Sequence, residues 1–157
     1  MEHLFYFIYS LLNNFSFIVV IVSGGLAQVI KLYIYWIKER ELNIWHIFEA
    51  GGMPSSHSAS VTALTLSIGL TQGWNSPLFT IAGVFAVIVM YDATGVRRSA
   101  GQQALILNKI IDDIYPNEKV QKEKLKEIIG HDPIEVVAGA VLAVIVTIIA
   151  YYVHLIR

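Results

Sequence analysis

Long apolar stretches alternate with short polar segments along the 157 residues of the chain. Residues 4–30 include no formally charged side chain, and within residues 50–91 the only titratable side chains are those of His57 and Tyr91. A third stretch without Lys, Arg, Asp or Glu covers residues 136–156. A helix needs about 20 apolar residues to cross the hydrocarbon core of a bilayer. Each stretch is therefore long enough to span a membrane, and the middle one is long enough to do so twice.

Turn-forming residues divide these stretches into separate helices. Asn13-Asn14 interrupts the first stretch, and the segment GWNSP at residues 73–77 splits the middle one into two spans joined by a very short loop. Asp132 and Pro133 have the residue types of an N-cap and a first helical position, so they predict the start of the last helix. We therefore predict an all-α fold: a polytopic membrane helical bundle in one domain, residues 1–157. Its four spans lie near residues 15–37, 56–72, 77–91 and 134–155, after a short interfacial segment at residues 4–12.

The distribution of positive charge predicts the orientation of this bundle. Four spans place segments 38–55 and 92–133 on one side of the membrane, and the termini and the 73–76 turn on the other. The Lys and Arg residues of the first side are Lys38, Arg40, Arg97, Arg98, Lys109, Lys119, Lys122, Lys124 and Lys126, whereas only Arg157 lies opposite. Positive charge is enriched on the cytoplasmic side of membrane proteins. We expect a bacterial plasma membrane, with a cytoplasmic insertion at residues 99–130 whose part from residue 117 forms an amphipathic helix.

Composition excludes several classes of function. The chain is 55% hydrophobic and 15% charged, its net charge is −1, and it has no cysteine. Without cysteine there is no thiolate nucleophile, disulfide or cysteine-ligated metal site. The near-neutral charge provides no basic stripe of the kind that binds nucleic acid.

Polar clusters stand at the span ends on the predicted cytoplasmic side. The first is Lys31 with Lys38, whose ammonium groups either reach the lipid headgroups as anchors or provide a fixed cation for an anion. The second is the segment GGMPSSH at residues 51–57, a tight loop that leads into a helix N-terminus, where free N–H groups favour an anion. Helix capping by Ser55 or Ser56 is the simpler explanation of the serines. It gives no reason for His57.

Two further clusters carry charge. In YDATGVRRSAG, residues 91–101, Arg97 and Arg98 either anchor a span or present planar guanidinium groups to a phosphate. The candidate accessory residues are Asp92, Gly95 and Gly101 here, and Gly52 in the previous cluster. In GHDPIE, residues 130–135, Glu135 either closes a capping box with Asp132 or orients the imidazole of His131 for attack. Phosphoryl transfer requires cations, a nucleophile and an acid for the leaving oxygen, and together the clusters offer a candidate for each role.

These strings resemble the phosphatidic acid phosphatase type 2 (PAP2) superfamily, which also contains bacterial acid phosphatases and vanadium haloperoxidases. GGMPSSHSA, YDATGVRRSAG and GHDPIEVVAGA are most similar to its small divergent membrane branch, and the likeness covers nearly everything from residue 24 onward. Lys31 fits the Lys of the first superfamily motif, although Lys38-Glu39 stands where Arg-Pro would be. The segment PSSH at residues 54–57 resembles Pro-Ser-Gly-His, the second motif. Arg97 resembles the first half of the third motif, and His131 with Glu135 resembles its second half, after an insertion of roughly thirty residues.

The resemblance implies a role for each residue. His131 would be the nucleophile that forms a phosphohistidine, Glu135 would orient it, and His57 would protonate the leaving alcohol. The phosphate would be held by Lys31, Ser55 and Arg97, with help from Arg98 and the N–H group of Ser56. No metal or cofactor would be needed. The implied substrate is a lipid phosphate at the cytoplasmic face, with phosphatidate, phosphatidylglycerophosphate and polyprenyl phosphates all open.

Three alternatives remain open on the sequence alone. A non-catalytic membrane protein that binds phosphate headgroups would keep the cations but would not need the histidines. The small residues Gly139 and Ala143, with Ala82 and Ala86, allow close helix approach either within the chain or in a homodimer. Asp92, Asp112 and Asp113 could collect a cation, although helix capping or a solvated surface is the commoner role of such residues.

Overall fold

The chain folds into helices throughout the part that the structure describes. A computed structural model describes residues 1–40, 51–114, 125 and 130–156, and in this part there are helices and no strand. The helices are α1 (Glu2–Leu12), α2 (Phe15–Glu39), α3 (Ser56–Gln72), α4 (Pro77–Thr94), α5 (Val96–Ile114) and α6 (Pro133–Ile156). The predicted all-α fold is confirmed. The amphipathic helix expected from residue 117 lies almost entirely outside the described residues.

The turn-forming residues that predicted the helix boundaries also form these boundaries in the structure. Asn14 caps α2, because its side chain accepts a hydrogen bond from the backbone N–H of Phe17 at 3.0 Å. Gly73 ends α3 with a φ of 91°, a conformation that glycine adopts without steric cost. Ser76 then caps α4, and Pro77 occupies its first turn. Local turn chemistry therefore fixes where α2 and α4 begin and where α3 ends.

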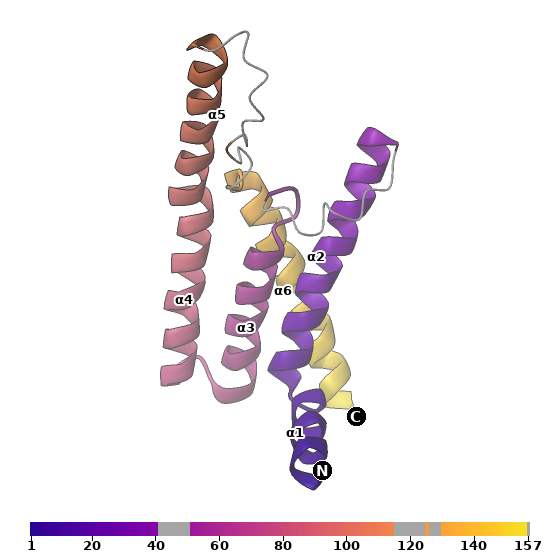
Figure 1. Ribbon diagram of the computed structural model, residues 1–157. Helices are drawn as coiled ribbons and strands as arrows, with labels where there is room; N and C mark the ends of the chain where they lie inside the picture. Colours follow the sequence, from indigo (N-terminus) through magenta and orange to yellow (C-terminus); the bar gives the residue numbers. More distant parts are fainter. Residues whose placement is uncertain (41–50, 115–124, 126–129, 157) are drawn as a thin grey trace.

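Helix α3 lies at the centre of the bundle. It packs against α2, α4 and α6, while α5 continues the direction of α4 beyond Gly95 as one long rod (Figure 1). Three helical segments are long and apolar enough to cross a membrane, namely Phe15–Glu39, Pro77–Ile114 and Pro133–Ile156. Helix α3, with 17 residues, is shorter and lies among them.

Small residues allow the helices to approach closely. The packed core consists of Val19, Ala27, Ala59, Ala63 and Ala143, which come from α2, α3 and α6. Ala82 and Ala86 of α4 are also buried within the chain, at 5% and 4% exposure. The small residues at these positions thus serve packing inside the chain. A homodimer stays a prediction.

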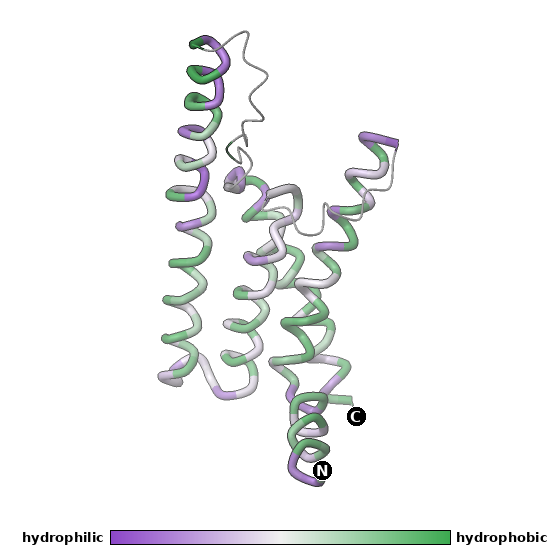
Figure 2. The backbone as a smooth tube through the Cα atoms, in the orientation of Figure 1, coloured by the Kyte–Doolittle hydropathy of each residue, from purple (hydrophilic) through white to green (hydrophobic). Residues whose placement is uncertain are grey.

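Polar residues gather at one end of the bundle. Figure 2 shows hydrophobic positions along most of α2, α4 and α6, and hydrophilic ones at the end of α2, along α5 and at the start of α6. The two termini and the turn between α3 and α4 lie at the opposite end (Figure 1). Helices α2, α3, α4 and α6 therefore run in alternating directions, as expected, and the four membrane spans stay a prediction.

Candidate functional site

The predicted motifs meet at the polar end of the bundle through backbone hydrogen bonds. The N–H of Ser55, in the loop before α3, donates to the carbonyl of Glu135 in α6 at 3.0 Å. The N–H of His131, just before α6, donates to the carbonyl of Ala93 near the end of α4, also at 3.0 Å. Three segments that are far apart in the sequence are thereby held side by side.

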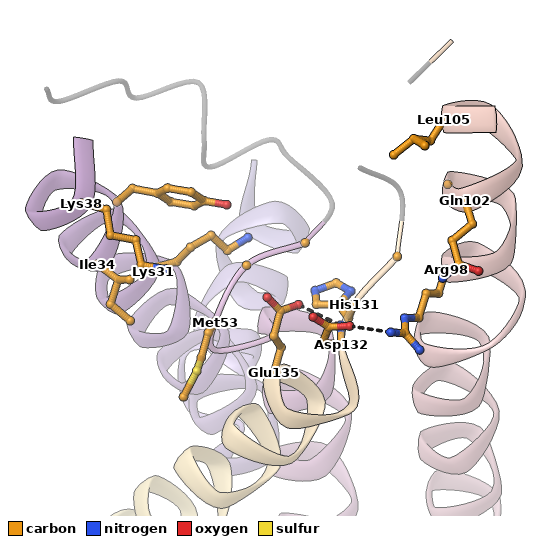
Figure 3. Close-up of a pocket in the computed structure, with 15 residues that line it drawn as sticks. Lys31, Ile34, Lys38, Met53, Arg98, Gln102, Leu105, His131, Asp132 and Glu135 are labelled. Atoms are coloured by element: carbon orange, nitrogen blue, oxygen red, sulfur yellow. Dashed lines mark hydrogen bonds and ion pairs between the residues drawn. The ribbon is translucent and has the colours of Figure 1, made fainter. Parts of the chain in front are cut away.

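A cavity of about 450 Å³ opens where these segments meet α2 (Figure 3). Its charged and polar lining residues are Lys31, Tyr35, Lys38, Arg98, Gln102, His131, Asp132 and Glu135. Glycines at positions 51, 52, 101 and 130 also line it. The cavity therefore combines several cations with an imidazole in one polar hollow, which is the lining expected for an anionic ligand.

Lys31 projects into this cavity rather than along the outer surface of α2. Its side chain is 2% exposed, and Figure 3 shows the ammonium group pointing toward the centre of the site. Gly52 lies against the stem of Lys31, since a Cβ at Gly52 would stand 3.2 Å from Cδ of the lysine. This arrangement favours the fixed cation over the headgroup anchor, the alternative that the sequence left open.

His131 is almost fully enclosed, with 3% of its surface exposed. Its Nδ1 is buried and has no hydrogen-bond partner among the described residues. Burial first, and then nearby positive charge, lowers the pKa of His131 from 6.5 to about 4. The charges belong to His57, Lys31 and Arg97. At neutral pH the imidazole is therefore uncharged, which is the form that can act as a nucleophile.

His57 lies next to His131 although it comes from a different helix. The two ring centroids are 6.1 Å apart, and the rings meet edge to face at 80°. His57 is the second residue of α3 and is exposed rather than buried. The structure thus brings the two predicted imidazoles together.

The two serines of the second cluster point in different directions. Ser55 is fully buried and caps α3, since its hydroxyl accepts a hydrogen bond from the N–H of Ser58 at 3.3 Å. The hydroxyl of Ser56 accepts from Nε2 of Gln28 at 3.2 Å, so it faces α2. Capping of α3, the simpler of the two roles considered from the sequence, therefore explains Ser55. The phosphate-binding role of Ser55 and Ser56 stays a prediction.

The paired arginines make separate ion pairs. Arg97 contacts Asp92 through Nε at 2.6 Å, within the turn that joins α4 to α5. Arg98 contacts Asp132 at 3.1 Å and lines the cavity (Figure 3). The resemblance implies Arg97 as the main phosphate ligand, but Arg98 is the arginine that lines the cavity. Arg97 is near enough for its charge to lower the pKa of His131.

Glu135 caps the start of α6. Its Oε2 accepts a hydrogen bond from the backbone N–H of Asp132 at 3.1 Å (Figure 3). This contact is half of a capping box, the simpler of the two roles that the sequence allows. The orientation of His131 by Glu135 stays a prediction, and it requires the carboxylate to turn from Asp132 toward Nδ1.

Sequence comparison agrees with this geometry. The profile of the divergent PAP2 family matches residues 12–146. The chain belongs to this family. A relative, the uncharacterized membrane protein YuiD of Bacillus subtilis (strain 168), is 43% identical over 153 residues, which cover 90% of this chain and 97% of the relative. No solved structure matches significantly. The predicted family is confirmed, and with its long apolar helices the chain is an integral membrane protein.

Two glycines of this divergent PAP2 protein are part of the site although the sequence did not predict that role: Gly139 was expected only to allow close helix approach, and Gly130 had no predicted role in the site. A Cβ at Gly130 would stand 2.4 Å from the backbone N and Cα of Arg98, and one at Gly139 would stand 2.3 Å from the carbonyl oxygen of Ser55. Both positions let one segment approach the backbone of another. Of the accessory glycines, Gly95 ends α4 with its N–H donating to the carbonyl of Tyr91 at 2.8 Å, and Gly101 is buried beside the cavity.

Tyr35 lines the cavity although no motif in the sequence indicated it as a functional candidate. It lies one helical turn after Lys31, so both residues share a face of α2. That i, i+4 spacing is the signal that could have found it. As for a metal, no group of three or more His, Asp or Glu side chains in the described part of the chain could hold one.

Proposed function

We propose that this divergent PAP2 protein is a membrane phosphatase that hydrolyses a lipid phosphate monoester through a phosphohistidine at His131. The observation that supports this proposal best is the placement of a buried lysine and a buried, uncharged histidine at one cavity. Lys31 and His131 are 2% and 3% exposed, and both line the same hollow. A phosphate bound in this hollow would lie beside a fixed cation and a neutral imidazole, two of the groups that phosphoryl transfer to a histidine requires.

The phosphate would be held by Lys31 and Arg98. The lysine supplies a point charge, and the guanidinium fork of Arg98 can bind two phosphate oxygens at once. Arg98 is paired with Asp132 at 3.1 Å, so a phosphate would compete with that carboxylate for the guanidinium group. Both cations would neutralise the equatorial oxygens as the phosphorus is attacked.

The reaction would proceed in two displacements. The nitrogen of His131 available to the cavity is Nε2, because Nδ1 is enclosed. Its lone pair would form a bond to phosphorus while the bond from phosphorus to the alcohol oxygen breaks, and protonated His57 would give its proton to that oxygen. Water would then attack phosphorus, neutral His57 would take a proton from the water, and the phosphorus–nitrogen bond would break. Inorganic phosphate would leave, and both histidines would return to their starting states.

The site lies at the ends of the membrane helices, where lipid headgroups stand. The excess of Lys and Arg on this side supports a site at the cytoplasmic face, by the positive-inside rule. A lipid phosphate could therefore enter sideways from the cytoplasmic leaflet without leaving the bilayer.

The test is phosphate release by the purified protein in EDTA from a panel of detergent-solubilised lipid phosphates. His131→Asn should abolish release, whereas His154→Asn should not, because His154 lies near the end of α6 and stacks against Phe15, 5.1 Å away. Both variants should retain the wild-type melting temperature. Release that persists in His131→Asn would overturn the assigned nucleophile, and release that disappears in EDTA would overturn the metal-independent mechanism.

A second candidate function is the binding of phosphate headgroups without catalysis. It is favoured by the contact of Glu135 with the N–H of Asp132, which leaves Nδ1 of His131 without a described partner. A binding protein would need Lys31 and Arg98 but not a reactive His131. Retention of phosphatidate by the wild type and by His131→Asn, with no phosphate release by either, would support this function over the phosphatase.

A further inference from the structure

A second cavity, of about 540 Å³, has His57 in its lining, and most of its other lining residues have no part in the proposed chemistry. It is formed by α2, α3 and α4, and His57 is part of its wall. Because the His57 ring also meets the His131 ring at a centroid distance of 6.1 Å, this groove begins beside the candidate active site. A substrate bound at His131 could thus extend into it.

The polarity of the groove changes with depth in the membrane. Near His57 it is lined by Gln28, Ser56 and Ser60, and farther away by apolar residues. On α2, with a rise of 1.5 Å per residue, Gln28 lies about 5 Å deeper than Lys31, and Ile21 lies about 15 Å deeper. At the deep end Ile21 and Phe85 are 58% and 52% exposed, so the groove opens toward the lipid. A polar band close to the phosphate site therefore leads into an apolar, lipid-facing end.

The polar band retains hydrogen-bond donors for a ligand. Ser56 accepts a hydrogen bond from Gln28 at 3.2 Å, and no described residue accepts one from its hydroxyl. The hydroxyl of Ser60 likewise has no described acceptor, and it lies against Gly24, where a Cβ would stand 2.5 Å from the Ser60 oxygen. Two hydroxyl donors thus stand one to two helical turns below the charged cavity.

We propose that this groove holds the acylglycerol part of the substrate, with ester carbonyls at Ser56 and Ser60 and one acyl chain at the apolar end. The proposal rests on the phosphatase function and specifies its substrate class. In a diacylglycerol phosphate, ester carbonyls follow the phosphate within a few bonds, and hydrocarbon follows the esters. A prenyl phosphate has hydrocarbon immediately after the phosphate, so it would offer neither hydroxyl hydrogen an acceptor, which is unfavourable away from water.

The groove can be blocked from an exposed position in its wall. A Cβ at Gly25 of α2 would meet nothing within 4 Å, so Gly25→Trp adds an indole at the groove wall without a clash at its Cβ. Val22→Trp is the matched control, because Val22 is 49% exposed on the same helix and lines no part of this groove. Phosphate release should be measured from dioleoyl phosphatidate and from the water-soluble ester para-nitrophenyl phosphate.

The ratio of kcat/KM for phosphatidate to kcat/KM for para-nitrophenyl phosphate should fall at least tenfold in Gly25→Trp and should be unchanged in Val22→Trp. Ser60→Ala should lower kcat/KM for phosphatidate about two- to tenfold relative to its diether analogue, which lacks the carbonyls. An unchanged ratio in Gly25→Trp, or wild-type turnover of farnesyl phosphate equal to that of phosphatidate, would overturn the proposal.

A binding measurement separates this proposal from the phosphatase function. Phosphatidate with a photoreactive diazirine near the end of one acyl chain should label residues 20, 21 and 85 in the wild type, and much less in Gly25→Trp. Labelling without phosphate release would leave the groove assigned and refute the phosphatase. Phosphate release with labelling confined to other faces of the bundle would refute the groove alone.

Discussion

The substitution Gly139→Ala tests the close approach that joins two of the predicted motifs. A Cβ at this position of α6 would stand 2.3 Å from the carbonyl oxygen of Ser55 and 3.2 Å from its N and C atoms. Ordinary carbon contacts lie at about 3.5–4.0 Å, so the Ser55 backbone would have to move by roughly 1 Å. That backbone leads into α3, which carries His57, and its N–H is bonded to Glu135 at 3.0 Å.

The expected cost follows from overpacking. Forcing an extra methyl group into a packed contact destabilises the folded state by about 1–3 kcal/mol. Replacing Gly by Ala inside a helix stabilises it by up to about 1 kcal/mol. Gly83→Ala is the matched control, because its Cβ would meet only Cγ2 of Thr65 at 3.9 Å, an ordinary contact. The two variants share the helix-propensity gain. Their free energies of unfolding should therefore differ by the overpacking cost of about 1–3 kcal/mol.

The assay is thermal unfolding in detergent together with phosphate release. At about 2–4 °C per kcal/mol, Gly139→Ala should melt roughly 2–12 °C below Gly83→Ala. Its activity should fall about 10- to 100-fold, because a shift of 1 Å in a catalytic group is costly. If both variants melt together and hydrolyse substrate at the same rate, the contact between Gly139 and Ser55 does not position the site.

Three further predictions concern the charged groups of the cavity. The folded state holds the pKa of His131 near 4, below its usual 6.5, so the unfolded state binds more protons between these two pH values. His131 therefore makes the protein less stable as the pH falls from about 6.5 to 4. The melting temperature of His131→Asn should fall less over this range than that of the wild type. Arg98→Gln should raise KM for a phosphate ester at least tenfold, and Arg97→Gln should raise it less, since Arg98 lines the cavity whereas Arg97 pairs with Asp92. Gly52→Ala should weaken retention of phosphatidate in a lipid-binding assay, because its φ of +90° disfavours a side chain and the new Cβ would press on the Lys31 stem; retention equal to the wild type would refute that contact.

The helices and the residues that bound them could be predicted from the sequence because their causes are local. Asn14, Gly73 and Ser76 act through their own backbone or the next turn, and apolar length alone indicates a span. The family could also be predicted, since the three strings GGMPSSHSA, YDATGVRRSAG and GHDPIEVVAGA carry the resemblance. The sequence predicted only that Lys31 and the loops around His57 and His131 lie on the same side of the membrane. The structure shows in addition the cavity at which Lys31 and His131 meet.

Features that depend on contacts between distant segments could not be predicted. Nothing local distinguishes Arg97 from Arg98, so which guanidinium lines the cavity depends on how α5 leaves Gly95. The close approaches at Gly130 and Gly139 involve backbone from other segments. The spacing of Glu135 from Asp132 and His131 allowed it either to cap α6 or to orient His131. Only the three-dimensional structure shows which contact the carboxylate makes. The groove beyond His57 is likewise formed by three helices together.

If His131 carries the phosphoryl group during turnover, the phosphohistidine can be trapped. The purified protein in EDTA should be mixed with dioleoyl phosphatidate, quenched in base, in which phosphohistidine survives, and digested for mass spectrometry. We expect a phosphoryl group on the peptide that contains His131, in an amount that rises within one turnover, and none on the same peptide of His131→Asn. Phosphate release at the wild-type rate with no phosphoryl group on His131, or with one on His57 instead, would contradict it.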